Sequence, residues 1–136
     1  AAWMLDSAVP FMVLLTRQRY PWLQSQMDKH VEVHFQPIID LSDGGRIYAQ
    51  EALCRLRTPE GELLNGYETF TLARHLGRLD ALDMALQHKA LQRKARDLPA
   101  GMTLFLNVLP STLMQPAWPA QFMQWLSAYE IDHMRW

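Results

Sequence analysis

The chain has 136 residues, a formal net charge of −1 at pH 7 and a hydrophobic fraction of 49%. This length allows one ordinary domain at most, and the composition supports a buried core and excludes a disordered chain. The near-neutral charge provides no overall field that would recruit nucleic acid or an acidic membrane. The single cysteine, Cys54, excludes an internal disulfide and a cysteine-rich zinc site, and it fits a reducing, cytoplasmic compartment.

Residues 1–30 are predicted to form a helical or linking segment ahead of the main domain. Residues 1–15 are apolar, but two polar residues and a proline interrupt them, so no stretch reaches the ~18–20 residues of a membrane span. Within residues 16–30, apolar side chains recur at the three- and four-residue spacing that is typical of a helix. These side chains are Tyr20, Leu23 and Met27.

Residues 31–38 alternate between apolar and polar side chains, as a half-buried strand does, and a second strand begins near Arg46. The link between them is short and contains the turn sequence Asp43–Gly45. Parallel strands need a crossover of a dozen residues or more, so this link predicts an antiparallel hairpin. His30 and His34, four residues apart, would form a zinc pair only on a helix, which the strand pattern excludes.

The second strand, centred on Tyr48–Leu56, has two unlike faces. One face is small and apolar, whereas the other carries Glu51, Leu53 and Arg55. Burying charges is costly unless they are paired or bind a metal or ligand. Two interpretations follow. Either Glu51 and Arg55 form a structural ion pair near the strand end, or Glu51 binds a metal and Arg55 a phosphate, with Leu53 against an apolar ring.

Three helices and one more strand are predicted in the rest of the chain. Asn65 suits the start of a helix over about 67–76, and Gly77 suits its end. Residues 102–108 are almost continuously apolar, which indicates a fully buried parallel strand. A last helix is expected over about 119–129. Its core stripe comprises Phe122, Trp125, Leu126 and Tyr129.

A helix over about 79–96 is predicted between Gly77 and the buried strand, and its last turns are rich in cations. We interpret these cations as a solvated face that the helix macrodipole favours, rather than as a nucleic-acid patch. They are Lys89, Arg93, Lys94 and Arg96. Asp83, in the same helix, is interpreted as structural.

Three stretches in consistent order and spacing carry a resemblance: His34–Ile38, Glu51–Arg55 and Leu106–Val108. From about Val31 to about Pro110 the chain resembles the EAL domain family, which comprises bacterial cyclic-di-GMP phosphodiesterases and their degenerate relatives. The resemblance implies an α/β fold, the N-terminal part of a TIM-like (β/α)8 barrel with an antiparallel first strand. Such barrels take about 250 residues. We therefore expect a truncated domain, with residues 31–136 as the first half of an EAL domain.

The resemblance also implies which side chains form the site. The positions of Glu51 and Asn107 match metal ligands, and a strand-end amide beside a carboxylate suits Mg²⁺ or Mn²⁺. The positions of Gln36, Leu53 and Arg55 match residues that contact the cyclic dinucleotide, where the planar fork of an arginine binds phosphate oxygens. Structural alternatives exist, because a strand-end asparagine usually caps a turn and a glutamine often satisfies backbone groups.

The implied function is hydrolysis of cyclic-di-GMP to linear pGpG with two divalent metals. The family's remaining ligands lie in its second half, so we expect these 136 residues alone to be inactive. The alternative is a degenerate EAL domain that acts as a cyclic-di-GMP receptor or a protein-interaction module, but intact Glu51 and Asn107 favour the enzyme. Three barrel strands leave an open edge, which predicts a homodimer or a domain-swapped assembly.

Overall fold

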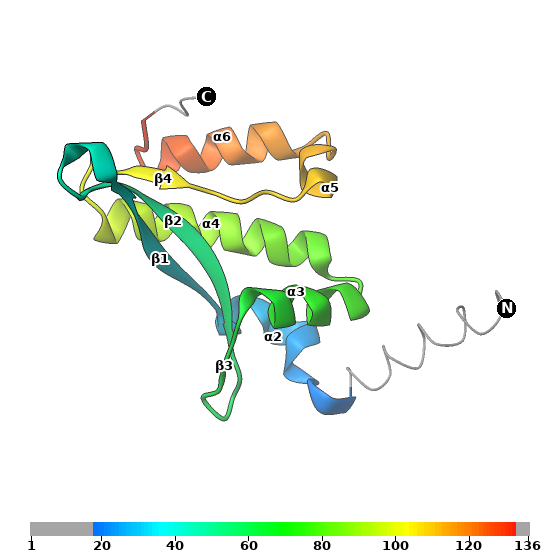
Figure 1. The fold of residues 1–136 in the computed structure, drawn as a ribbon. Helices are drawn as coiled ribbons and strands as arrows, with labels where there is room; N and C mark the ends of the chain where they lie inside the picture. Colours follow the sequence, from blue (N-terminus) through cyan, green and yellow to red (C-terminus); the bar gives the residue numbers. More distant parts are fainter. Residues whose placement is uncertain (1–17, 133–136) are drawn as a thin grey trace, which may run out of the picture. The chain divides into compact units, whose positions relative to one another are not determined.

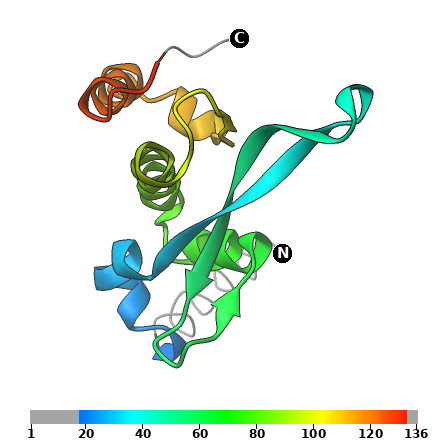
Figure 2. The ribbon, with the colours of Figure 1, turned by 90° about the vertical axis from the view of Figure 1, so that its left-hand side faces the viewer.

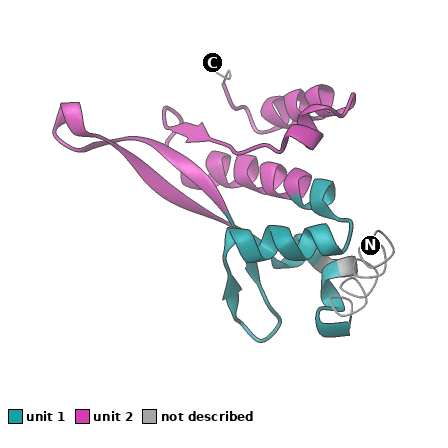
Figure 3. Ribbon diagram, turned by 45° about the vertical axis from the view of Figure 1, so that its right-hand side comes forward, with its two compact units in different colours: residues 1–32, 54–82 teal, residues 33–53, 83–136 magenta. Residues whose placement is uncertain are grey.

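The computed structural model describes residues 18–132, and the predictions for residues 1–17 lie outside that range. None of the helices in the described range has both the length and the apolar character that a membrane span requires. The chain divides into two compact units (Figure 3). Within the described range they comprise residues 18–32 with 54–82, and residues 33–53 with 83–132.

The first unit contains helix α2 (Trp22–His30), which follows Pro21 and passes directly into strand β1 (Val31–Asp40) (Figure 1). A proline suits the start of a helix, because its φ is already helical and the first turn leaves N–H groups unpaired. Leu23 and Met27, one turn apart, are both buried. The helical pattern predicted before the first strand is therefore confirmed over Trp22–His30, whereas Tyr20 and Pro21 precede this helix and are not part of it.

Strand β2 (Arg46–Arg57) ends in the first unit, where it pairs with the short antiparallel strand β3 (Leu63–Leu64). Hydrogen bonds between Thr58 and Glu62 close the turn between them. The Thr58 N–H donates to the Glu62 carbonyl at 2.8 Å, and the Glu62 N–H donates to the Thr58 hydroxyl oxygen at 3.0 Å. Gly61 in this turn has a φ of +91°, a left-handed conformation that glycine adopts without a steric penalty.

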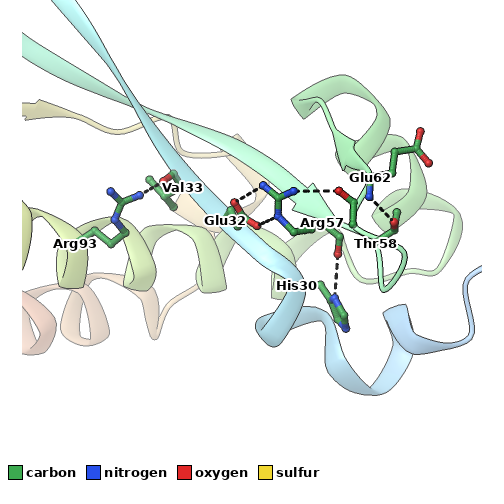
Figure 4. A network of polar contacts seen from close by, with 8 residues as sticks. His30, Glu32, Val33, Arg57, Thr58, Glu62 and Arg93 are labelled. Carbon is green, nitrogen blue, oxygen red and sulfur yellow. Dashed lines mark hydrogen bonds and ion pairs between the residues drawn. The ribbon is translucent and has the colours of Figure 1, made fainter.

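Arg57 joins the start of β1 to the turn that follows β2 (Figure 4). Its guanidinium donates to the Glu32 carboxylate and, at 3.0 Å, to the carbonyl oxygen of Gly61. The Nδ1 of His30 donates to the Arg57 carbonyl at 2.9 Å. The hydrogen bond that Arg57 donates to Glu32 raises the pKa of Arg57. Because the pair is exposed to water, it orders the strand ends more than it stabilises the fold.

Helix α3 (Gly66–His75) begins after Asn65, as predicted. Asn65 Oδ1 accepts from the Glu68 N–H at 2.9 Å, and Asn65 Nδ2 donates to the Glu68 carboxylate at 3.3 Å. Gly77 follows the helix with a φ of +65°, and helix α4 (Leu79–Asp97) begins two residues later. These predicted helix boundaries are confirmed to within one or two residues.

In the second unit, β1 and β2 form a twisted hairpin (Figure 2). They are neighbours in the sheet, and the short 3₁₀ helix η1 (Leu41–Asp43) and two glycines join them, so they run antiparallel. The glycines, Gly44 and Gly45, have φ of +63° and +82°. The hydroxyl and N–H of Ser42 donate to the Asp40 carboxylate at 2.6 and 2.9 Å, which lowers the pKa of Asp40. The predicted hairpin is confirmed.

Strand β4 (Thr103–Phe105) pairs with β2 in parallel, with Glu51 opposite Phe105. The strand predicted over residues 102–108 is thus right in position but wrong in length and burial. Phe105 is 46% exposed, and Thr103 is exposed as well. A continuous apolar run predicts apolar neighbours on both faces. Among the described residues, however, β4 has β2 as its one strand partner.

Helix α4 from Asp83 onward, α5 (Pro110–Leu113) and α6 (Trp118–Ala128) complete the second unit. Helices α4 and α6 run side by side (Figures 1 and 2). Leu91 of α4 packs against Phe122 and Leu126 of α6. The predicted core stripe of the last helix is confirmed. Partly buried side chains surround this cluster, namely Leu106, Trp118, Trp125, Tyr129 and Ile131.

Candidate functional site

Two of the predicted site residues meet at neighbouring strands of the second unit. Glu51 lies on β2 opposite Phe105, the last residue of β4. Paired residues in a ladder share a face, and a step of two residues returns an extended chain to the same face. Asn107 follows Phe105 by two residues, and its Nδ2 donates to Glu51 Oε1 at 3.0 Å.

This bond leaves two oxygen atoms outside it, Oε2 of Glu51 and Oδ1 of Asn107. Both are hard donors of the kind that Mg²⁺ and Mn²⁺ prefer. Glu51 is partly buried and Asn107 is exposed, so a ligand can reach the pair from solvent. Over residues 18–132, no three or more His, Cys, Asp or Glu side chains gather in a way that could hold a metal ion. The described part of the chain therefore offers one carboxylate and one amide at this place.

Asp83 of α4 holds the segment that follows Asn107. Its Oδ2 accepts from the Leu109 backbone N–H at 3.0 Å and from Gln87 Nε2 at 3.0 Å. Gln87 Oε1 in turn accepts from Trp118 Nε1 at 2.8 Å. The sequence interpretation of Asp83 as structural agrees with these bonds. The roles of Gln87 and Trp118 were missed, although two polar residues four apart on one buried helix face were a usable signal.

The other predicted site residues lie on β1 and β2. Gln36 is an exposed residue of β1, and Leu53 is a partly buried residue of β2, both in the second unit. Arg55, farther along β2, belongs to the first unit, and its Nη1 donates to the Cys54 carbonyl at 2.6 Å. Of the predicted site residues, Glu51 and Asn107 are joined by a hydrogen bond, the amide–carboxylate bond described above. The dinucleotide contacts of the other three stay predictions.

Arg93 of α4 fixes the part of β1 that precedes Gln36. Its guanidinium donates to the Val33 carbonyl (Figure 4), and its carbon centre lies 4.8 Å from the centroid of the Phe35 ring. Its Nε donates to Asp97 at 2.9 Å. The interpretation of Arg93 as part of a solvated face is therefore wrong. Sequence pattern could not reveal this role, because Val33 and Phe35 lie about 60 residues away in the chain.

Comparison with known proteins gives a family for this arrangement. A family model described as the EAL domain matches residues 22–135. A curated relative, the cyclic di-GMP phosphodiesterase NbdA of Pseudomonas aeruginosa, is 39% identical over 75 residues. Those residues are 55% of this chain and 9% of the relative.

Solved structures show the same fold. The PaMucR phosphodiesterase in complex with cyclic-di-GMP is 18% identical with a TM-score of 0.66, and the match covers 87% of this chain and 47% of that one. The FimX EAL domain of Xanthomonas citri in complex with cyclic-di-GMP is 17% identical with a TM-score of 0.65, covering 94% and 47%. The chain thus spans about half the length of these structures. The expected α/β class, as part of a TIM-like barrel, is confirmed.

Proposed function

Because the chain belongs to the EAL domain family, we propose that it supplies the first half of a site that binds cyclic-di-GMP and hydrolyses it to linear pGpG. The observation that carries this proposal is the 3.0 Å bond between Asn107 and Glu51. It brings together the two residues that match the family's metal ligands. The phosphodiesterase relative and the two solved complexes support the choice of substrate.

The Glu51–Asn107 pair fits a divalent metal. The carboxylate and the amide oxygen would hold Mg²⁺ or Mn²⁺, because both ions favour hard oxygen donors. One carboxylate and one amide bind such ions weakly, so a complete site takes further acidic ligands from the second half of an EAL domain. When bound, the metals supply an activated water and neutralise charge on the phosphoryl group.

Gln36, Leu53 and Arg55 would contact the cyclic dinucleotide. Arg55 carries a planar fork of donors that matches two phosphate oxygens. Its acceptor in the structure is the neutral Cys54 carbonyl, with which a charged phosphate competes well. Leu53 offers an apolar contact to a base, and the Gln36 amide both donates and accepts hydrogen bonds. By this proposal the chain alone holds part of the site and does not turn over substrate.

A receptor for cyclic-di-GMP is the second candidate function. It is supported by the likeness to the FimX EAL domain of Xanthomonas citri, whose structure is a complex with cyclic-di-GMP. A receptor needs the phosphate and base contacts but no complete metal centre. The two candidates therefore differ in what the Glu51 carboxylate contributes. The enzyme needs it for cleavage, and the receptor does not.

Calorimetric titration of cyclic-di-GMP tests the proposal, with Mg²⁺ or Ca²⁺ present and turnover followed in the same samples. It is carried out on this chain and on a complete EAL domain that contains it. We expect the complete domain to bind and cleave, and the chain alone to bind more weakly without cleaving. Glu51→Ala should lower cleavage by on the order of a hundredfold or more, because it removes a metal ligand.

Glu60→Ala is the matched control, because Glu60 is an exposed acid in the turn after β2. It should leave both binding and cleavage unchanged. Binding without cleavage by the complete domain would identify a receptor. If the complete domain neither binds nor cleaves cyclic-di-GMP, the family resemblance reflects ancestry only and the proposed function is rejected.

A further inference from the structure

Leu109 is a point at which the segment after β4 is fixed to the helices of the second unit. Its N–H donates to Asp83 Oδ2 at 3.0 Å, and its carbonyl accepts from the Thr112 N–H at 3.0 Å, where α5 begins. Asn107 lies two residues before this point and two residues after the end of β4. Its backbone is therefore held from both sides, by a strand ladder before it and by Asp83 after it.

Asp83 is itself held rigidly. It is 2% exposed, and its Oδ2 accepts a second bond from Gln87 Nε2 at 3.0 Å. Gln87 is 1% exposed, and its Oε1 accepts from Trp118 Nε1 at 2.8 Å. This chain of bonds runs from α6 through α4 to Leu109. A buried acceptor that is fixed in this way sets the position of its donor closely, because the desolvated group has no water to pair with instead.

We propose that Asp83 is a positioning residue for the Glu51–Asn107 pair. By holding Leu109, Asp83 sets where the Asn107 amide lies relative to Glu51, and the ladder of β2 with β4 sets Glu51. Residues that orient metal ligands without touching the metal typically change metal affinity ten- to a hundredfold when they are removed. The inference rests on the proposed function, because it takes Glu51 and Asn107 to be metal ligands.

Substitutions in this chain separate positioning from general stability. Asp83→Leu keeps a similar size but removes the acceptor, whereas Asp83→Asn keeps an oxygen for the Leu109 N–H. Leu126→Ala removes a buried side chain from the core between α4 and α6 and alters neither of the groups that donate to Asp83. It is the matched control for lost stability.

Leu109→Pro tests the same bond from its other end and serves if Asp83→Leu does not fold. Leu109 has a φ of −67°, the value that proline requires, so the substitution removes the N–H donor and keeps φ at position 109. We expect Leu109→Pro to behave like Asp83→Leu.

The readout is paramagnetic broadening by Mn²⁺ of the Asn107 side-chain amide resonance in the isotope-labelled chain. We expect Asp83→Leu to need ten- to a hundredfold more Mn²⁺ for the same broadening. Asp83→Asn and Leu126→Ala should stay within about threefold of the unmodified chain. In metal-free samples, Asp83→Leu should shift the Asn107 side-chain resonance, and Leu126→Ala should leave it in place.

An equal Mn²⁺ response in the unmodified chain and Asp83→Leu overturns the inference. So does an equal loss in Leu126→Ala, because Asp83 would then act only through stability. If Mn²⁺ does not broaden the Asn107 resonance in the unmodified chain, then Asn107 is not a metal ligand. That result rejects the metal site of the proposed function rather than the positioning role of Asp83. The metal-free shift of Asn107 then still decides whether Asp83 positions that amide.

Discussion

At the scale of the residue, Asp97 is a carboxylate whose charge two arginines stabilise. Arg96 and Arg93 both donate to it, at 2.7 and 2.9 Å, and these bonds hold the pKa of Asp97 well below its ordinary value of 3.8. A lowered folded-state pKa adds stability that is present above the unfolded pKa and is lost as the pH falls through the folded value. Asp97 therefore stabilises the fold at neutral pH and progressively less below about pH 3.8.

Asp97→Asn should therefore lower the urea midpoint at pH 7, and the difference from the unmodified chain should shrink as the pH falls below 3.8. High salt should shrink it as well, because the ion pairs lie at the surface. Asp132→Asn, at an exposed site, is the control. A midpoint difference that is the same at all pH values would contradict this account of Asp97.

The candidate metal pair could be predicted from the sequence, whereas the residues that hold it could not. Glu51 and Asn107 occur in short motifs whose order and spacing are visible in the chain itself. Arg93 and Asp83 act on partners that are distant in sequence, and the Leu109 N–H that Asp83 holds is a backbone group that no side-chain pattern marks. Long-range hydrogen bonds to the backbone leave little trace in a single sequence.

At the scale of the element, α3 depends on its cap. Asn65 satisfies the Glu68 N–H, which the first turn of the helix would otherwise leave unpaired. Asn65→Ala should therefore lower the free energy of unfolding by about 1 kcal/mol, and Asn65→Asp should change it little because it keeps the acceptor. Urea denaturation of the two variants measures this difference. Equal stability of the alanine and aspartate variants would show that the cap contributes nothing.

Helix boundaries were predicted well and strand β4 was not, because the two depend on different information. A cap such as Asn65 and a stop such as Gly77 are local signals, so the sequence near each helix end is sufficient. The burial of β4 depends on what covers it. The apolar run of residues 102–108 suits a strand covered on both sides. In the described structure, however, β4 is three residues long, and its first and last residues are exposed to solvent.

At the scale of the whole molecule, the unpaired edge of β4 in the described structure predicts self-association. β2 is the one strand partner of β4 within residues 18–132, and Phe105 is 46% exposed. Open strand edges pair with other chains, so we expect a homodimer or a domain-swapped assembly of twice the 15.8 kDa monomer mass. Light scattering after size exclusion measures this mass.

Phe105→Lys should shift the chain toward the monomer, because a lysine on an edge strand opposes pairing. Met123→Lys, on an exposed site of α6, is the matched control and should leave the assembly intact. An unmodified chain that is monomeric at all concentrations would rule out the predicted assembly.

The parallel pairing of β2 with β4 also sets an order of events during synthesis. Ala49 pairs with Thr103, so the ribosome must add about fifty residues after β2 before the ladder can close, which takes roughly 3–10 s. During those seconds the newly made hairpin has an unsatisfied strand edge, while α3 and α4 can already form from local contacts. The Glu51–Asn107 pair spans 56 residues of the chain, so it forms only after α3 and α4 have been synthesised.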